Sequence, residues 1–134
     1  MQVTLEEIAA KALALTTEKG FHENERRLES RLKDSPESLK ELYYLENARR
    51  LALIHGEVSE ALEADRKDRH ADLRAFQADG DFAKHVKDTF EDELADIVIR
   101  TVELAAVNGI DLSAHVAAKM DYNKTRPYKF GKNY

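Results

Sequence analysis

The chain has 134 residues, no cysteine and a formal net charge of -5 at pH 7. Its length fits one domain, residues 1–134, which can bury roughly two thirds of its unfolded surface. Only 5 Gly and 2 Pro stand against 43% hydrophobic and 35% charged residues, which indicates a helical protein and argues against a sheet or a disordered chain. The missing cysteines exclude disulfides and thiolate metal sites, and the acidic charge argues against general nucleic-acid binding.

The first residues, MQVTLEE, lack the basic and apolar regions of a signal peptide. No apolar run approaches the length of a membrane span. A chain without cysteine also fits a reducing compartment. We therefore expect a cytoplasmic protein with no membrane partner.

The first helix is predicted to begin at Thr4, which with Glu7 has the spacing of a capping box, and to end at Gly20. The following residues, 21–34, are strongly charged and have few apolar anchors. We interpret them as a loop or a loose helical connection. Phe21 and His22 are its only candidates for contact with a site, and an ordinary exposed histidine is the expectation for His22.

The second helix is predicted to start at Ser35-Pro36, with the serine hydroxyl as the cap, and to run to about Lys67. Gly56 lies inside it and costs about 1 kcal/mol relative to Ala. This Gly indicates the close approach of another backbone or a ligand, or it is there by chance. The polar residues 66–81 contain a turn signal and are expected to form a loop that lets the next helix return antiparallel.

The third predicted helix contains the run Phe90 to Val107, which is apolar nearly all round. Asp81 or Thr89 can cap it, since Phe82 and Val86 favour a start before Phe90, and Asn108-Gly109 ends it. A fourth follows Asp111 and must end before Pro127. The pattern predicts an all-α fold, an antiparallel bundle of four to five helices. The surplus of apolar faces on both long helices makes a lone monomer an unfavourable state.

Two acidic pairs interrupt the long helices. Glu57 and Glu60 have the same spacing as Glu93 and Asp96, and this spacing places each pair on one helix face. Carboxylates in apolar surroundings are costly unless they are paired or bound to a metal. Two neighbouring helices can thus aim four carboxylates at one divalent cation.

The chemistry of these ligands narrows the choice of metal. Hard oxygen donors favour Mg²⁺, Mn²⁺ or Ca²⁺ over Zn²⁺, and Mg²⁺ is commonly bound by a few carboxylates together with substrate phosphates. No Glu-x-x-His motif is present, which disfavours redox iron. His55, His85 and His115 are expected to be core or surface histidines.

The C-terminal residues are basic. From residue 119 onward the chain has five basic residues and one acidic residue. Lys119, Asn123 and Arg126 would lie on one face of a helix that reaches that far, with Lys129 and Lys132 beyond it. Such a tail is suited to a small polyanion beside a metal site, or it merely balances the charge of the acidic body.

Together, the two acidic pairs, the phrase ELADIVIR and the ending K-x-x-x-N-x-x-R-P-Y-K-x-G-K over residues 119–132 resemble the MazG-like all-α nucleoside triphosphate pyrophosphohydrolases. Gly56 stands where that family often has the first of two adjacent glutamates. The segment between the pairs is also longer than in compact members.

This resemblance implies hydrolysis of (deoxy)nucleoside triphosphates to the monophosphate and pyrophosphate, as nucleotide-pool housecleaning, by a homodimer or homotetramer. It implies that Mg²⁺, with Mn²⁺ as a substitute, is held by four acids, and that Glu57 or Glu60 activates the water. The implied metal ligands are Glu57, Glu60, Glu93 and Asp96. The residues expected to bind the triphosphate are Lys119, Asn123, Arg126, Lys129 and Lys132.

Three alternatives stay open at this point. Two are related enzymes, a phosphoribosyl-ATP pyrophosphohydrolase and a dimeric dUTPase-type enzyme. The third is a non-catalytic oligomeric helical bundle whose acidic stripe binds a protein partner.

Overall fold

The computed structural model describes residues 2–133, and all regular secondary structure in this range is helical. The all-α prediction is therefore confirmed. The helices are α1 (Leu5–Glu18), α2 (Glu23–Leu32), α3 (Pro36–Arg66), α4 (Leu73–Asp79), α5 (Phe82–His85), α6 (Phe90–Val107), α7 (Leu112–Lys124) and the 3₁₀ helix η1 (Tyr128–Gly131).

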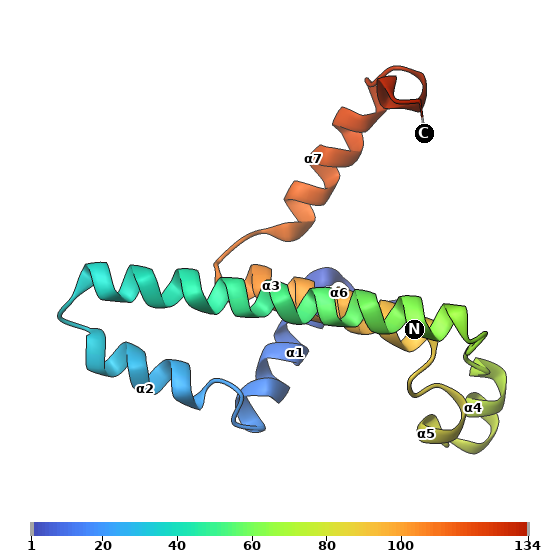
Figure 1. Cartoon of the computed structure of the whole chain (residues 1–134), viewed down its shortest axis with the longest axis horizontal. Coiled ribbons are helices and arrows are strands. Elements are labelled where there is room, and N and C mark those ends of the chain that lie inside the picture. The colour runs from blue at the N-terminus through green and yellow to red at the C-terminus, as the bar shows by residue number, and fades with distance from the viewer. Residues whose placement is uncertain (1, 134) are drawn as a thin grey trace.

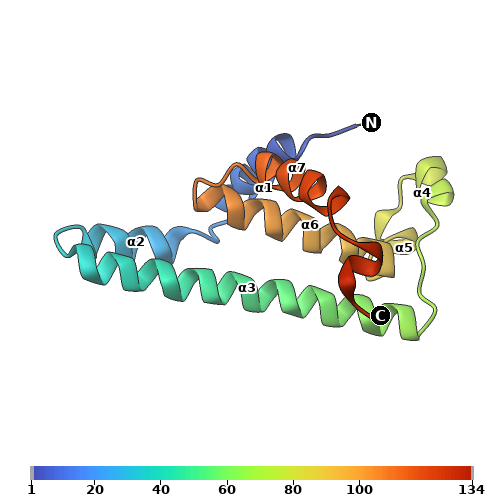
Figure 2. The same ribbon diagram turned by 90° about the horizontal axis from the view of Figure 1, so that it is seen from above.

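The two long helices form the centre of the molecule. Helices α3 and α6 run side by side in opposite directions, α1 packs against α6, and α2 folds back along the first half of α3 (Figure 1). Figure 2 shows from above that α4 and α5 cluster at the end of the molecule where α3 ends and α6 begins. Helix α7 leaves the body and projects away from it (Figure 1).

Local signals set most helix ends as predicted. The capping box of α1 is present, because Glu7 N–H donates to Thr4 Oγ1 at 3.1 Å and Thr4 N–H donates to Glu7 Oε2 at 2.8 Å. Asp111 caps α7 by accepting from Ala114 N–H at 2.9 Å. Gly109, with φ of 65°, provides the left-handed residue that ends α6.

Helix α3 begins after Ser35 as predicted, but the expected capping hydrogen bond of the Ser35 hydroxyl is absent. The Ser35 hydroxyl donates to the Ser38 hydroxyl at 2.9 Å and makes no capping hydrogen bond to the helix backbone. Pro36 does occupy the first turn, as expected. Its fixed φ therefore starts the helix without help from the serine side chain.

Residues 21–34, expected to be a loop or a loose helical connection, and residues 66–81, expected to be a loop, both contain helices. Residues 21–34 contain α2, and residues 66–81 contain α4, so the described chain has more helices than the predicted four to five. Helix α2 has no buried residue and is tied to α3 by the ion pair of Glu25 with Arg50. Phe21, Leu28 and Leu32 do recur at helical spacing, but so few apolar residues among many charged ones made the periodic signal easy to underrate. Helix α4 is only 7 residues long, and its ends are set by the Asp72 cap and by Gly80 at φ 76°.

The apolar core of a single chain is small. Among residues 2–133 no large side chain is completely buried, and several apolar side chains of α3 and α6 are exposed. The buried apolar residues are Ala12, Leu42, Ala61, Ala64, Val86, Val102 and Ala105. No helix in the described range combines the length and apolarity needed to cross a membrane.

Candidate metal centre

Three of the four predicted carboxylates meet between α3 and α6. Oxygen atoms of Glu57, Glu60 and Glu93 all lie within 4.8 Å of one another. The residues Glu57 and Glu93 are buried, at 8% and 5% exposure, whereas Glu60 is exposed. Asp96 lines the same cleft but contributes no oxygen to this cluster. The antiparallel pairing of the two helices thus brings the Glu57–Glu60 pair to Glu93, with Asp96 beside the cluster.

Glu93 is positioned by the start of α6. The buried Thr89 accepts a hydrogen bond from Asp92 N–H at 3.3 Å, while its hydroxyl donates to the Val86 carbonyl at 2.6 Å. Glu93 N–H in turn donates to the Thr89 carbonyl at 3.0 Å. The cap therefore fixes the first helical turn, from which the Glu93 side chain reaches α3.

Arg100 supplies the positive charge of the cluster. Its Nε donates to Glu57 Oε1 at 2.6 Å, and the side chains of Arg100 and Glu57 are 41% and 11% exposed. A buried carboxylate requires a charge partner or a set of hydrogen bonds. One guanidinium, however, compensates only one of the clustered carboxylates.

Burial and the uncompensated negative charge raise the pKa values of Glu93 and Asp96. Burial, a hydrogen bond to Glu57 and the charges of Glu60 and Glu57 raise the pKa of Glu93 from 4.5 to about 7. Burial and the charge of Glu57 also raise the pKa of Asp96. The folded chain therefore resists complete ionisation of these acids, as expected for carboxylates that are crowded together and buried.

The cluster opens into a cleft of about 1010 Å³. Its acidic wall comes from α3 and α6, and its apolar wall from residues at the α4 and α5 end of the molecule, including Leu73, Phe82 and Val86. The long segment between the two acidic pairs thus builds one side of this cleft. A cleft of this kind accommodates a small ligand that reaches the carboxylates from solvent.

Sequence reasoning missed further acids at this site. Asp88 and Asp92 form a second group with Glu93, whose oxygens also lie within 4.8 Å of one another. Asp88, Asp92, Asp96 and Arg100 recur every fourth residue, so they share a helix face wherever the chain is helical. That periodicity was the available signal, although Asp88 itself precedes α6 and has a φ of 59°.

The five residues expected to bind phosphate do not line the cleft of their own chain. Lys119 and Asn123 lie on α7, Arg126 follows it, Lys129 belongs to η1, and Lys132 comes after η1. The buried Oδ1 of Asn123 accepts no hydrogen bond from the described residues. A single chain therefore brings the carboxylates together but leaves these five residues apart from them.

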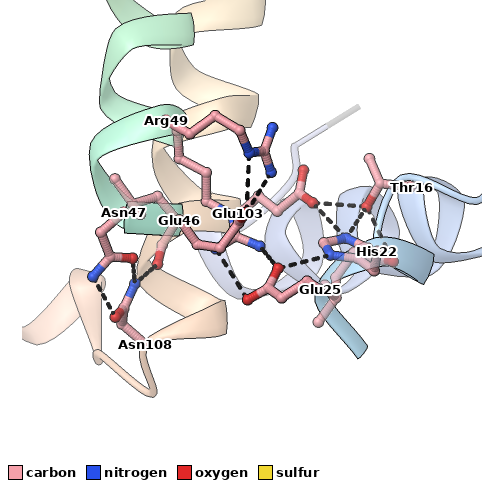
Figure 3. Close-up of polar contacts among 11 residues, drawn as sticks. Thr16, His22, Glu25, Glu46, Asn47, Arg49, Glu103 and Asn108 are labelled. Carbon is pink, nitrogen blue, oxygen red and sulfur yellow. Dashed lines mark hydrogen bonds and ion pairs between the residues drawn. The ribbon is translucent and has the colours of Figure 1, made fainter. Parts of the chain in front are cut away.

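The expectation for His22 was wrong, because this residue is buried, at 8% exposure. Its Nε2 lies 2.8 Å from Thr16 Oγ1 and 3.1 Å from Glu103 Oε1 (Figure 3). Glu103 belongs to α6, far along the chain, so local sequence gives no sign of this partner. The contact joins the α1–α2 connection to the central helix.

Gly56 shows no close neighbour. A Cβ atom built on this residue would meet no atom of the chain within 4 Å. Within one chain, neither a backbone nor a packed side chain explains the Gly at this position.

Comparison of the chain with protein-family models, with curated proteins and with solved structures gives no match.

Proposed function

We propose that the protein is a Mg²⁺-dependent nucleoside triphosphate pyrophosphohydrolase that forms the monophosphate and pyrophosphate. The observation that carries the proposal is the meeting of Glu57, Glu60 and Glu93 within 4.8 Å in an open cleft. The proposed ligands are these three glutamates and Asp96. The type of reaction is proposed from the resemblance of the acidic pairs and the basic C-terminal residues to those of MazG-like enzymes.

The donor set fits a hard divalent cation. All candidate ligands are carboxylate oxygens, which suit Mg²⁺ or Mn²⁺. The raised pKa values of Glu93 and Asp96 mean that added positive charge between the helices would favour their ionised forms. When bound, Mg²⁺ would neutralise phosphate charge and polarise the phosphoryl group under attack.

Side chains of the protein would activate the attacking water. Glu57 is held by Arg100 through Oε1, and we propose that Glu57 or Glu60 accepts the proton of the attacking water. Water oxygen then forms a bond to phosphorus as the anhydride bond between the α- and β-phosphates breaks. The leaving group is pyrophosphate, and the nucleoside retains one phosphate.

Completion of the site is proposed to require a second subunit. The exposed apolar residues Tyr44, Leu51, Val58 and Leu62 of α3 lie at helical spacing on one face, and their exposures are 63%, 51%, 48% and 58%. An exposed stripe of this kind marks an interaction surface. A helix as short as α7 is also marginal in water without packing. We propose a homodimer or homotetramer in which the basic α7 and tail reach the triphosphate in a neighbouring subunit.

A nucleotide screen with Mg²⁺, in which pyrophosphate is followed directly, tests the activity. Phosphoribosyl-ATP and dUTP belong in the panel because they separate the two related enzyme classes. Glu60→Gln and Asp96→Asn are expected to abolish turnover while circular dichroism shows an intact helical fold. Glu41→Gln is a matched control, because Glu41 is exposed on α3 and lines none of the cavities described.

Wild-type rates in Glu60→Gln or Asp96→Asn would refute the assignment. The competing function is that of a non-catalytic oligomeric bundle that binds a protein partner. The exposed apolar stripe on α3 fits this function as well as it fits an oligomeric enzyme. In that case Mg²⁺ would leave the melting temperature unchanged, and no nucleotide would yield pyrophosphate.

A further inference from the structure

A second cavity adjoins the carboxylate cleft. It has a volume of about 500 Å³ and lies among α1, α3, α6 and the connection that precedes α2. Asp96, Ile99 and Arg100 line both this cavity and the carboxylate cleft. A ligand whose phosphates reach the carboxylates therefore has room for its other end in the second cavity. Its volume falls in the range of small-molecule sites.

Charged residues of both signs line this cavity, namely Arg49, Arg50, Arg100, Asp96 and Glu103. Among the described residues, none of these arginines forms an ion pair with the Glu103 carboxylate. Its Oε1 accepts a hydrogen bond from Thr16 Oγ1 at 2.7 Å and lies 3.1 Å from His22 Nε2 (Figure 3). The side chains of Glu103 and His22 are 14% and 10% exposed. Among residues 2–133, the second oxygen of Glu103 has no hydrogen-bond donor within reach. One oxygen is thus held in place, and the other is left to accept.

A second layer of charges fixes His22. Its Nδ1 lies 3.9 Å from Glu25 Oε2, and Glu25 pairs with Arg50 of α3. Figure 3 shows how Glu25, His22, Thr16 and Glu103 follow one another. The chain of contacts joins α1, α2, α3 and α6, so the carboxylate is held by four helices and their connection. Preorganisation of this kind is what a selective binding group requires.

The contacts with Thr16 and His22 do not by themselves require a charged side chain at position 103. A hydroxyl and an imidazole are satisfied by an amide oxygen as well as by a carboxylate, and burying an unneeded charge is costly. The partly buried Glu103 lines a cavity and retains an unused acceptor. A ligand that donates a hydrogen bond would satisfy that acceptor.

We propose that Glu103, oriented by Thr16 and His22, selects the base of the nucleotide by accepting an N–H bond from an exocyclic amino group. The inference rests on the proposed function, because it takes the ligand to be a nucleotide. Cytosine and adenine present such an amino group, whereas uracil and hypoxanthine present a carbonyl oxygen at the same position. That carbonyl oxygen would face the Glu103 carboxylate, and two hydrogen-bond acceptors form no hydrogen bond with each other. Phe21, which lines the cavity and is 73% exposed, offers an aromatic face for the ring.

The test uses pairs of nucleotides that differ at this one position. With the full chain and Mg²⁺, kcat/KM for pyrophosphate release is measured for dCTP against dUTP and for dATP against dITP. The amino member of each pair is expected to be favoured roughly 10- to 100-fold, which is the range for a hydrogen bond to a charged group. Equal values within both pairs would overturn the inference.

Glu103→Gln separates base selection from a structural role. The Gln carbonyl can keep the contacts with Thr16 and His22, while its amide nitrogen presents a donor where the free oxygen was. The preference for the amino member is therefore expected to vanish or reverse. A general loss of activity with an unchanged preference would contradict the inference, and Glu41→Gln should behave as wild type.

A binding measurement keeps this inference distinct from the proposed function. Calorimetry with deoxycytidine monophosphate and deoxyuridine monophosphate, without metal, reads base selection in the absence of turnover. An affinity ratio of roughly 10 or more supports the role of Glu103 even if no triphosphate is hydrolysed. Equal affinities for the two monophosphates, or no binding of either, would overturn the role of Glu103 in base selection. If the protein also hydrolyses triphosphates in that case, the proposed function stands without it.

Discussion

Replacing Glu93 by Gln is expected to stabilise the metal-free protein above pH 7 and to leave its stability nearly unchanged near pH 4.5. The pKa of Glu93 is raised from 4.5 to about 7 by burial and by the neighbouring glutamates. Between these two pH values the unfolded chain has released the proton and the folded chain still holds it. The free energy of unfolding of the wild type therefore falls as pH rises through this window, and this contribution levels off above about pH 7.

The size of the effect follows from the pKa change. The rise in the Glu93 pKa from 4.5 to about 7 corresponds to at most about 3–4 kcal/mol, since each pKa unit is worth about 1.36 kcal/mol. The cleft is open, so solvent screening reduces this figure, and we expect about 1–2 kcal/mol. The position of Glu93 in the first turn of α6 favours the charged form by about 0.3–1 kcal/mol, which burial outweighs.

Thermal unfolding followed by circular dichroism measures this prediction at pH 4.5 and pH 8. At pH 8 without metal, Glu93→Gln should melt higher than the wild type by roughly 3–8 °C, and at pH 4.5 the two should coincide. Excess Mg²⁺ at pH 8 should reverse the order, because only the wild type keeps all its carboxylates. Glu41→Gln controls for the loss of one negative charge.

Equal destabilisation of Glu93→Gln at both pH values would refute the reasoning. It would mean that the Glu93 carboxylate is not strained by its neighbours and that the side chain acts in packing alone. Stabilisation at pH 8 that Mg²⁺ leaves untouched would confirm the repulsion but contradict the cation site.

Two further predictions concern α3. Gly56→Ala should raise the free energy of unfolding by about 1 kcal/mol, measured by chemical denaturation, because the added Cβ meets no atom and Ala favours the helix. Destabilisation would indicate that a partner covers this position. Leu62→Lys should reduce the molecular mass measured by light scattering to that of a monomer, since Leu62 is 58% exposed on the apolar stripe and a charge there opposes burial in an interface. An unchanged mass would place the interface elsewhere.

Local patterns in the sequence determined the all-α class and most helix ends. Thr4, Asp111 and Gly109 act within one turn of their own helix, so the residues themselves specify the boundary. The spacing of each acidic pair likewise fixes a shared helix face, because helical geometry is periodic. These features require no knowledge of where other helices lie.

Tertiary structure alone decided which faces meet. The register of α3 against α6 brings Glu57 and Glu60 to Glu93, gives Glu57 its partner Arg100, and leaves Asp96 beside the cluster. Whether residues 21–34 form a helix stayed open in the sequence, because α2 buries no residue of its own and is held by contacts with α3. His22 was misjudged for the same reason, since its partner Glu103 lies on a helix that only folding brings near. Periodicity describes one helix at a time, whereas burial and pairing depend on the register and crossing of two.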